Sequence, residues 1–575
     1  MWNARQRHGE DGAAVCPSLS PTLLTNAHFN FKYSANQIFS KMKTEKLIQR
    51  LSLFIFAMAL TMSAWAQNAS GNEDYLNIAT KEDWKAFGDR VRSGERDLNA
   101  KLTADIDLGT DIWKIGSEGT GYSGTFDGQG HTITINWSDT AGDCMALFPF
   151  VTDATIQNLH IKGQMTSDDV PLSVFSYEAS GTTTFSGCIS EVNITTGNTK
   201  DNSCAAGMVI TAGRAARLTF NDCLVMGDIT GTTANSKRGM AGFVCYQDDN
   251  ATCTLTHCLY LGTNNAAGGG FTFAPNPTFE SCCFYLNACG EPDGIDKIEE
   301  DELFTGILAR HLQDNRTDRC YWAQVLGKMP ILYREADKSK INYVYYDVAN
   351  EQWACDDFRL TDGTLLPIGL NFTAARVTYD RTLSVGKATV CLPYELPIRG
   401  FKAYFLSGGN DSKVYFEEVT GMLEPYFPYL LVADGVVQLD GENIWVKAFT
   451  PEFIHMSTGN YTFNGTIHDF DFWEVDKSAY ILQNDGKFHK VTGNPAAVIP
   501  PYRAFITRRN SQEAKELSII LDGETTGIHG VTDDAAGLNS GPVYDLQGRC
   551  VADRFMRRQL PAGVYIAGDR KIIVK

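Results

Sequence analysis

Regularly spaced cysteines are the residues of this sequence with the clearest chemical potential. Each lies at the same place in a recurring segment, and an earlier copy, TIQNLHIKGQMT, carries a leucine there instead. A position that accepts leucine is apolar, and a free cysteine packs like a small hydrophobic residue. The spacing therefore predicts a structural ladder of buried side chains, Leu159, Cys188, Cys223, Cys258 and Cys282. Disulfides between neighbouring copies remain the alternative.

Carboxylates were the next candidates, because a glycosidase needs two of them about 5–10 Å apart. The nearest candidates are Asp222 and Asp228. One 35-residue period before and after Asp222 lie Gly187 and His257, so no acidic column forms. Irregular loops, such as 164–180 or 291–316, remain a possible source of carboxylates for a polysaccharide-active enzyme.

Other short motifs indicate turns rather than chemistry. The segment DGQGH at 127–131 is interpreted as a turn with a surface histidine. Asp105, Asp107 and Asp111 lack the glycine and terminal glutamate of a calcium-binding loop. The sequence contains no CxxC, HExxH or G-x-S-x-G pattern. It therefore predicts no catalytic residue, no cofactor and no metal site. Aromatic clusters such as 426–429 and 470–473 are expected in a β core, with sugar stacking as the alternative.

A fixed period organises the first half of the chain. TFSGCISEVNITTG, LTFNDCLVMGDITG and TLTHCLYLGTN align on their cysteines, and Gly207 and Gly242 repeat 35 residues apart. Each unit reads as strand, turn and strand with no helix, which predicts a right-handed parallel β-helix. Before it, Thr80 and Asp83 approximate a capping box for an amphipathic helix that would cover the open end.

A different pattern follows residue 341. Runs of five to eight β-rich residues alternate with polar turns, which is typical of an antiparallel β-sandwich. The fold class is therefore all-β. The expected organisation is an upstream extension from a mis-called start (1–41), a signal peptide (42–66), the helix and β-helix (67–335), the sandwich (341–521), a linker (522–540) and a small C-terminal β domain (541–575).

Export is indicated by residues 42–66. A basic start precedes the apolar stretch LSLFIFAMAL, and Ala64-Trp65-Ala66 forms a small-x-small cleavage site. The remaining chain has no apolar run long enough to span a membrane. The net charge of −18 makes nucleic acid an improbable partner.

The C-terminal 33 residues have a strand pattern of their own. DLQGR, LPAGVYI and KIIVK predict short strands, with a two-residue hairpin at Gly568-Asp569. These segments resemble the sorting domain of the type IX secretion system, which exports proteins across the outer membrane of certain Gram-negative bacteria. The matching residues are Asp545, Leu546, Gly548, Arg549, Gly563 and Tyr565. The resemblance implies contact with that machinery.

The Gly-rich repeats and the FDGQGHTI segment resemble β-helix regions of bacterial surface proteins with GLUG-type repeats. TVCLPYELP and IPPYRAFIT resemble a β-domain of such proteins. Together these features predict an extracellular or outer-membrane surface protein, adhesin-like, that binds a glycan or a host surface protein. The alternative is a polysaccharide lyase or glycoside hydrolase using one face of the β-helix.

Overall fold

The structure is a computed structural model. It describes residues 75–575 except 139–141, 143, 198–203, 232–238, 265–269, 288–295, 384, 451–454, 468–472, 476–478, 493–496, 510–513, 523–541, 546–548, 553–559, 561–562, 568–569 and 575. The predicted upstream extension and signal peptide, residues 1–66, lie outside this range. No helix among the described residues has both the length and the apolar character needed to cross a bilayer.

The predicted amphipathic helix is confirmed as α2 (Lys81–Arg92). The Thr80 hydroxyl accepts a hydrogen bond from the backbone N–H of Asp83 at 3.1 Å, and the Asp83 carboxylate accepts one from the backbone N–H of Thr80 at 3.0 Å. This capping box satisfies two amide groups at the start of the helix. Trp84, Phe87 and Val91 are fully buried on one face, and the Trp84 ring lies 5.5 Å from that of Phe126.

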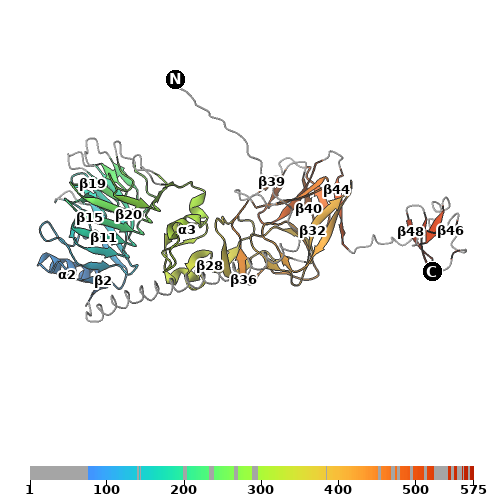
Figure 1. The fold of residues 1–575 in the computed structure, drawn as a ribbon, viewed down its shortest axis with the longest axis horizontal. Coiled ribbons are helices and arrows are strands. Elements are labelled where there is room, and N and C mark those ends of the chain that lie inside the picture. Colours follow the sequence, from blue (N-terminus) through green and yellow to red (C-terminus); the bar gives the residue numbers. More distant parts are fainter. Residues whose placement is uncertain are drawn as a thin grey trace, which may run out of the picture. The chain divides into compact units, whose positions relative to one another are not determined.

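The first half of the described chain forms parallel sheets, here called the parallel stack (residues 76–297). The largest pair consists of an eight-stranded and a nine-stranded sheet, and a four-stranded and a three-stranded sheet accompany them. Successive strands of the chain enter different sheets, so neighbours within one sheet come from successive repeats (Figure 1).

The strands of the parallel stack are short. The eight-stranded sheet contains β1 (Leu76–Ile78), β2 (Ala100–Leu102), β4 (Thr125–Asp127), β7 (Thr155–Gln157), β11 (Thr182–Ser186), β15 (Arg217–Asn221), β20 (Thr252–Thr256) and β22 (Phe279–Ser281). The nine-stranded sheet contains β3 (Ile106–Gly109), β5 (Thr132–Ser138), β8 (His160–Ser167), β12 (Ile189–Thr196), β16 (Leu224–Val225), β17 (Ile229–Gly231), β21 (Leu259–Tyr260), β23 (Phe284–Tyr285) and β24 (Asp296–Lys297). The two smaller sheets contain β6 (Phe150–Thr152), β10 (Ser176–Ser180), β14 (Val209–Ala212) and β19 (Val244–Gln247), and β9 (Leu172–Ser173), β13 (Ala205–Ala206) and β18 (Met240–Ala241).

The pairing register reproduces the sequence period in the middle of the stack and departs from it at the end. Phe185 pairs with Phe220, and Phe220 with Leu255, each step being 35 residues. The Phe185 and Phe220 rings stack with centroids 5.1 Å apart. In the last repeat, however, Thr256 pairs with Ser281, a step of only 25 residues. Where the 35-residue step holds, apolar side chains therefore stack on like side chains inside the sheets.

Antiparallel pairing dominates the second half of the chain, here called the antiparallel region (residues 322–521). A six-stranded sheet has the order β26 (Pro330–Leu332), β25 (Trp322–Val325), β27 (Tyr343–Asp347), β28 (Gln352–Leu360), β29 (Phe372–Tyr379) and β36 (Gly441–Val446). A ten-stranded sheet has the order β30 (Gly386–Val390), β35 (Tyr429–Ala433), β32 (Lys402–Gly409), β33 (Lys413–Val419), β44 (Glu516–Leu521), β41 (Phe488–Lys490), β40 (Ala479–Leu482), β43 (Ala504–Arg508), β38 (Tyr461–Gly465) and β37 (His455–Thr458). Parallel pairs occur only between β28 and β29 and between β33 and β44 among the described strands of these two sheets.

The strands between residues 322 and 332 belong to the six-stranded sheet of the antiparallel region. β25 pairs with β27 in an antiparallel ladder. A short helix, α3 (Ile307–Gln313), precedes these strands.

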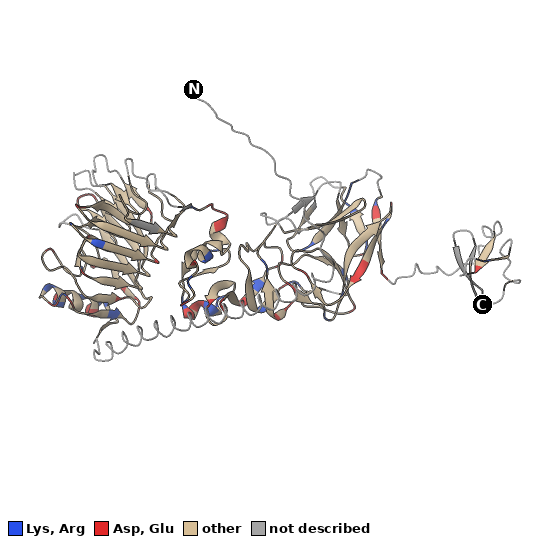
Figure 2. Ribbon diagram, in the orientation of Figure 1, with Lys and Arg blue, Asp and Glu red and all other residues tan. Residues whose placement is uncertain are grey.

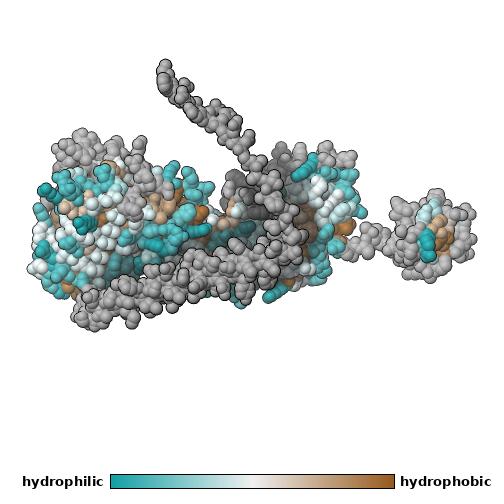
Figure 3. Space-filling model, viewed as in Figure 1, coloured by the Kyte–Doolittle hydropathy of each residue, from teal (hydrophilic) through white to brown (hydrophobic). Residues whose placement is uncertain are grey.

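The described part of the C-terminal tail forms a small antiparallel sheet with the order β46 (Cys550–Ala552), β45 (Val543–Asp545), β47 (Gly563–Ala567) and β48 (Arg570–Val574). Ala567 pairs with Arg570, as the predicted two-residue hairpin requires. Charged residues are sparse over the parallel strands and denser on α2 and around α3 and β28 (Figure 2). Hydrophilic and intermediate side chains cover most of the visible face of the parallel stack (Figure 3).

Candidate functional site

A column of left-handed turns marks one corner of the parallel stack. Each turn joins a strand of the eight-stranded sheet to one of the nine-stranded sheet, and each has a positive φ between 51° and 63° at Asn158, Gly187, Asp222, His257 and Cys282. Asparagine, aspartate, histidine and glycine tolerate this conformation better than most residues. We call these five residues the corner column.

The residue after each corner points into the core and forms the ladder. Leu159, Cys188, Cys223 and Cys258 are fully buried. The thiols of Cys188, Cys223 and Cys258 each lie within hydrogen-bond reach of a carbonyl oxygen of the preceding repeat, at 3.4, 3.5 and 3.6 Å. Every cysteine in the described part of the chain is a free thiol. Burial, followed by the neighbouring Cys223 thiol, raises the pKa of the thiols of Cys188 and Cys258.

The structure corrects the last member of the ladder. Because the final repeat is 25 residues long, Cys283 follows Cys258 in the inward position and is almost fully buried. Cys282 instead occupies the corner column, with a φ of 51° and a partly exposed side chain. The sequence alone does not show which of the two adjacent cysteines, Cys282 or Cys283, points into the core; the strand register does.

Asp222 is the carboxylate of the corner column; it is buried and forms part of a hydrogen-bond network. Arg316 donates two hydrogen bonds to it, both at 2.8 Å. The indole N–H of Trp322 donates a third, also at 2.8 Å. The Arg316 guanidinium lies 3.7 Å from the centre of the Tyr321 ring. Asp222 therefore anchors the segment after α3 to the parallel stack and is not a free catalytic acid.

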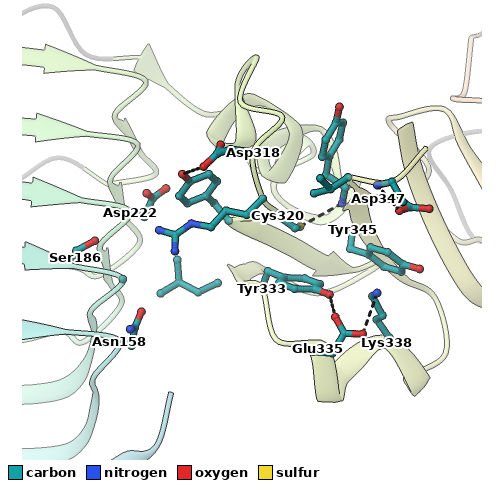
Figure 4. Close-up of a pocket in the computed structure, with 17 residues that line it drawn as sticks. Asn158, Ser186, Asp222, Asp318, Cys320, Tyr333, Glu335, Lys338, Tyr345 and Asp347 are labelled. Atoms are coloured by element: carbon teal, nitrogen blue, oxygen red, sulfur yellow. Dashed lines mark hydrogen bonds and ion pairs between the residues drawn. The ribbon is translucent and has the colours of Figure 1, made fainter. Parts of the chain in front are cut away.

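A groove runs beside this anchor. Two adjoining cavities of about 630 and 580 Å³ share Asn158, Gly187, Leu332, Tyr333 and Glu335. One wall is made of corner residues, and the other comes from residues 318–349. Figure 4 shows Asn158, Ser186 and Asp222 at the ends of stacked strands, and Tyr333 and Tyr345 on the second wall, with their hydroxyls directed away from those strands. We call this the corner groove.

Tyrosines and charged side chains dominate the second wall of the corner groove. The tyrosines are Tyr321, Tyr333, Tyr345 and Tyr346, and the charged residues are Asp318, Arg319, Glu335, Lys338 and Asp347. The hydroxyl of Tyr321 donates to Asp318 at 2.7 Å. The hydroxyl of Tyr333 donates to Glu335, which also pairs with Lys338 at 3.0 Å (Figure 4).

These contacts lower the pKa values of two groove carboxylates, Glu335 and Asp318. The hydrogen bond from Tyr333, followed by that from Lys338, lowers the pKa of Glu335. Burial acts to raise the pKa of Asp318, but the hydrogen bond from Tyr321 and the nearby backbone N–H groups outweigh it, so the net shift is downward. A general acid in a glycosidase needs the opposite, a raised pKa. Neither carboxylate is therefore tuned to donate a proton at neutral pH.

The other candidates from the sequence have structural partners. Asp127 accepts hydrogen bonds from the backbone N–H of Gln129 and from the side-chain amides of Gln157 and Asn158, at 2.9 to 3.1 Å. His131 lies 3.1 Å from Asp105. Asp111 pairs with Lys81, and Asp107 accepts from the backbone N–H of Gly109, so the three aspartates 105, 107 and 111 do not converge.

The loops considered as carboxylate sources contain helices and strands where the structure describes them. Residues 164–180 contain the end of β8 and all of β9 and β10, and residues 291–316 contain α3. The aromatic residues Tyr426 and Tyr429 are buried core, as expected. Residues 470–472 lie outside the described range. Sequence analysis did not identify the tyrosines of the corner groove, because no spacing pattern connects them to the corner column.

In the tail, Asp545 and Arg549 form an ion pair at 2.7 Å, and the Arg549 backbone N–H also donates to the Asp545 carboxylate. Asp545 pairs with Tyr565 on the adjacent strand, and Tyr565 is buried. Gly563 begins β47. Leu546 and Gly548 lie outside the described residues.

Comparisons with known proteins assign no family. No family model matches the chain, and no curated protein matches it. One solved structure, from Bacteroides ovatus and described as "a putative immunoglobulin A1 protease", is similar at 13% sequence identity with a TM-score of 0.31. The match covers 46% of this chain and 93% of that structure.

Proposed function

We propose that this chain is an exported, surface-displayed protein of the adhesin type that binds an extended polar ligand, a glycan, in the corner groove. In this proposal the parallel stack is a right-handed parallel β-helix of the GLUG-repeat kind. The antiparallel region is a sandwich that spaces it, and the tail is a type IX sorting domain. The signal-like segment 42–66 and the tail residues support export.

The observation that carries the proposal is the composition of the corner groove. Four tyrosines line it together with carboxylates that already hold hydrogen-bond partners. Tyrosine offers an apolar ring and a polar hydroxyl, which suits a ligand with alternating C–H faces and hydroxyls. Each of the two adjoining cavities has a volume within the range of small-ligand sites.

The enzyme alternative rests on analogy with other β-helix proteins. The pKa values of Glu335 and Asp318 are lowered, whereas the general acid of a glycosidase needs a raised pKa, and this supports binding over hydrolysis. Asp222, the sequence's nearest candidate, is held by Arg316 and Trp322.

The test is to incubate the full chain with a panel of polysaccharides and to measure retained complex and newly formed chain ends together. A fragment ending at residue 335 is unsuitable, because it would separate β25 and β26 from β27. Retention without new ends is the expected result. New chain ends would make the protein an enzyme, and no retention on any polysaccharide would overturn the glycan proposal.

A further inference from the structure

Three side chains with metal-binding atoms meet beside the last two corners of the parallel stack. They are His257 and Cys282, on consecutive repeats, and Asp314, directly after α3. One nitrogen, one sulfur and one oxygen atom from these residues all lie within 4.8 Å of one another. The three residues are far apart in sequence, so spacing could not reveal the cluster.

The backbone fixes the origin of each of these side chains. Thr256 pairs with Ser281, which stacks His257 on Cys282, and both have the left-handed conformation at φ 55° and 51°. The Asp314 backbone N–H donates to the carbonyl of Arg310 at 3.0 Å and ends α3. Leu308, Ala309 and Leu312 of that helix are buried. The cluster is therefore preorganised by two packed elements.

His257 contributes an atom whose bonding is incomplete. Its Nε2 is buried and has no hydrogen-bond partner among the described atoms. The closest carboxylate oxygen, Oδ2 of Asp314, lies 3.7 Å away, beyond hydrogen-bond distance. A buried ring nitrogen without a partner is uncommon in folded proteins. A ligand placed between these atoms would complete the bonding of both.

The surrounding charges suit a divalent cation. Arg316 is the nearby positive group, and its charge is offset by the bidentate pair with Asp222. Once a cation is bound, the Cys282 thiolate and the Asp314 carboxylate supply two negative charges, and the neutral imidazole of His257 supplies a lone pair. A cation of charge +2 would therefore be balanced within the cluster.

We propose that His257, Cys282 and Asp314 bind a Zn²⁺-class ion, with water as the fourth ligand. Nitrogen, sulfur and oxygen ligands at 2.0–2.3 Å are the set that Zn²⁺ takes in proteins. The thiolate disfavours Mg²⁺ and Ca²⁺, which select oxygen ligands. Binding releases the proton of the Cys282 thiol to solvent as the Zn–S bond forms. The ion ties the segment after α3 to the parallel stack, independently of any ligand in the corner groove.

The test is a titration of the metal-free, phosphine-reduced full chain with Co²⁺, followed by displacement with Zn²⁺. We expect one equivalent of Co²⁺ to give a thiolate-to-cobalt charge-transfer band and Zn²⁺ to abolish it. Cys282→Ser should remove the band, and His257→Gln and Asp314→Asn should each weaken binding at least about tenfold. Zn²⁺ should also raise the midpoint of thermal unfolding of the wild-type chain.

Two variants serve as matched controls. Cys283→Ala removes the adjacent thiol, which points into the core, and should keep the band. His489→Gln alters a second His and carboxylate cluster, in which Asp485 pairs with His489 and Glu516 pairs with Lys487. It should leave the affinity unchanged. Circular dichroism of each metal-free variant reports folding. No band in the wild-type chain, or a band that survives Cys282→Ser, would overturn the proposal.

Discussion

The parallel stack and the antiparallel region bury polar atoms in different ways. In the parallel stack, like residues lie on like residues, so one structural solution recurs: a corner residue with positive φ, then an inward thiol. In the antiparallel region the buried tyrosines each find a separate partner. Tyr394 donates to the carbonyl of Leu439, and Tyr426 donates to that of Lys447. Because the parallel stack repeats, its register can be predicted from the sequence. Its stability should be sensitive to any substitution that breaks the stacking.

The largest effect on the free energy of unfolding should come from breaking the buried ion pair of Asp222 and Arg316. Asp222→Asn leaves Arg316 without its carboxylate in a nearly buried site, since the side chains are 8% and 20% exposed. We expect a loss of about 3–5 kcal/mol in the free energy of unfolding. The surface pair of Arg90 and Glu95 is the control, and Glu95→Gln should change the free energy of unfolding far less than Asp222→Asn does, because water screens an exposed pair. Denaturant unfolding measures both, and equal losses would contradict the role of Asp222 as an anchor.

Stacked glycines should show the next largest effect. A Cβ on Gly207 would meet the carbonyl oxygen of Gly242 at 2.4 Å, whereas a Cβ on Gly435 meets nothing within 4 Å. Gly207→Ala should therefore destabilise by about 1–3 kcal/mol. Gly435→Ala should change stability by no more than about 1 kcal/mol, and in the stabilising direction. If Gly207→Ala folds as stably as wild type, the repeats do not approach as closely as the register indicates.

The cysteine ladder predicts a smaller effect and a clear reactivity pattern. Cys223→Ser places a hydroxyl in a fully buried site and should cost about 1–2 kcal/mol, whereas Cys550→Ser alters an exposed residue and should cost nothing measurable. Thiol labelling followed by mass spectrometry gives the complementary readout. Cys550 should react in the native protein, and Cys188, Cys223 and Cys258 only after unfolding. Failure to label the ladder even after unfolding would instead indicate disulfides.

The smallest effect concerns pH. The pKa of Glu335 is lowered in the folded protein by the hydrogen bond from Tyr333, so its contribution is complete above the unfolded value near 4.5. That contribution is lost as the pH falls through the lower, folded pKa. Because Glu335 is exposed, the change should stay below about 0.5 kcal/mol. Thermal unfolding of wild type and Glu335→Gln between pH 3 and 6 measures it, and a Glu335→Gln curve parallel to wild type would contradict it.

The 35-residue period and the capping box were the two sequence features that predicted most of the fold. Thr80 and Asp83 specify a helix start locally, and the 35-residue step set the register from Phe185 to Leu255. The prediction failed where the period changed, placing Cys282 instead of Cys283 in the ladder. The anchor of Asp222 and Arg316 joins residues 94 positions apart, and no local pattern encodes such a contact. The corner groove depends on that anchor, which is why its tyrosines could not be predicted.

One binding comparison tests whether the corner groove is the ligand site. Titration calorimetry of wild type, Tyr346→Ala and Tyr415→Ala would use a polysaccharide retained in the panel. Tyr346 lines the groove, and Tyr415 is a partly exposed tyrosine of β33 outside it. We predict that Tyr346→Ala weakens binding at least about tenfold, or about 1.4 kcal/mol, while Tyr415→Ala matches wild type. Unchanged binding by Tyr346→Ala, or equal loss in both variants, would place the ligand elsewhere and contradict the account.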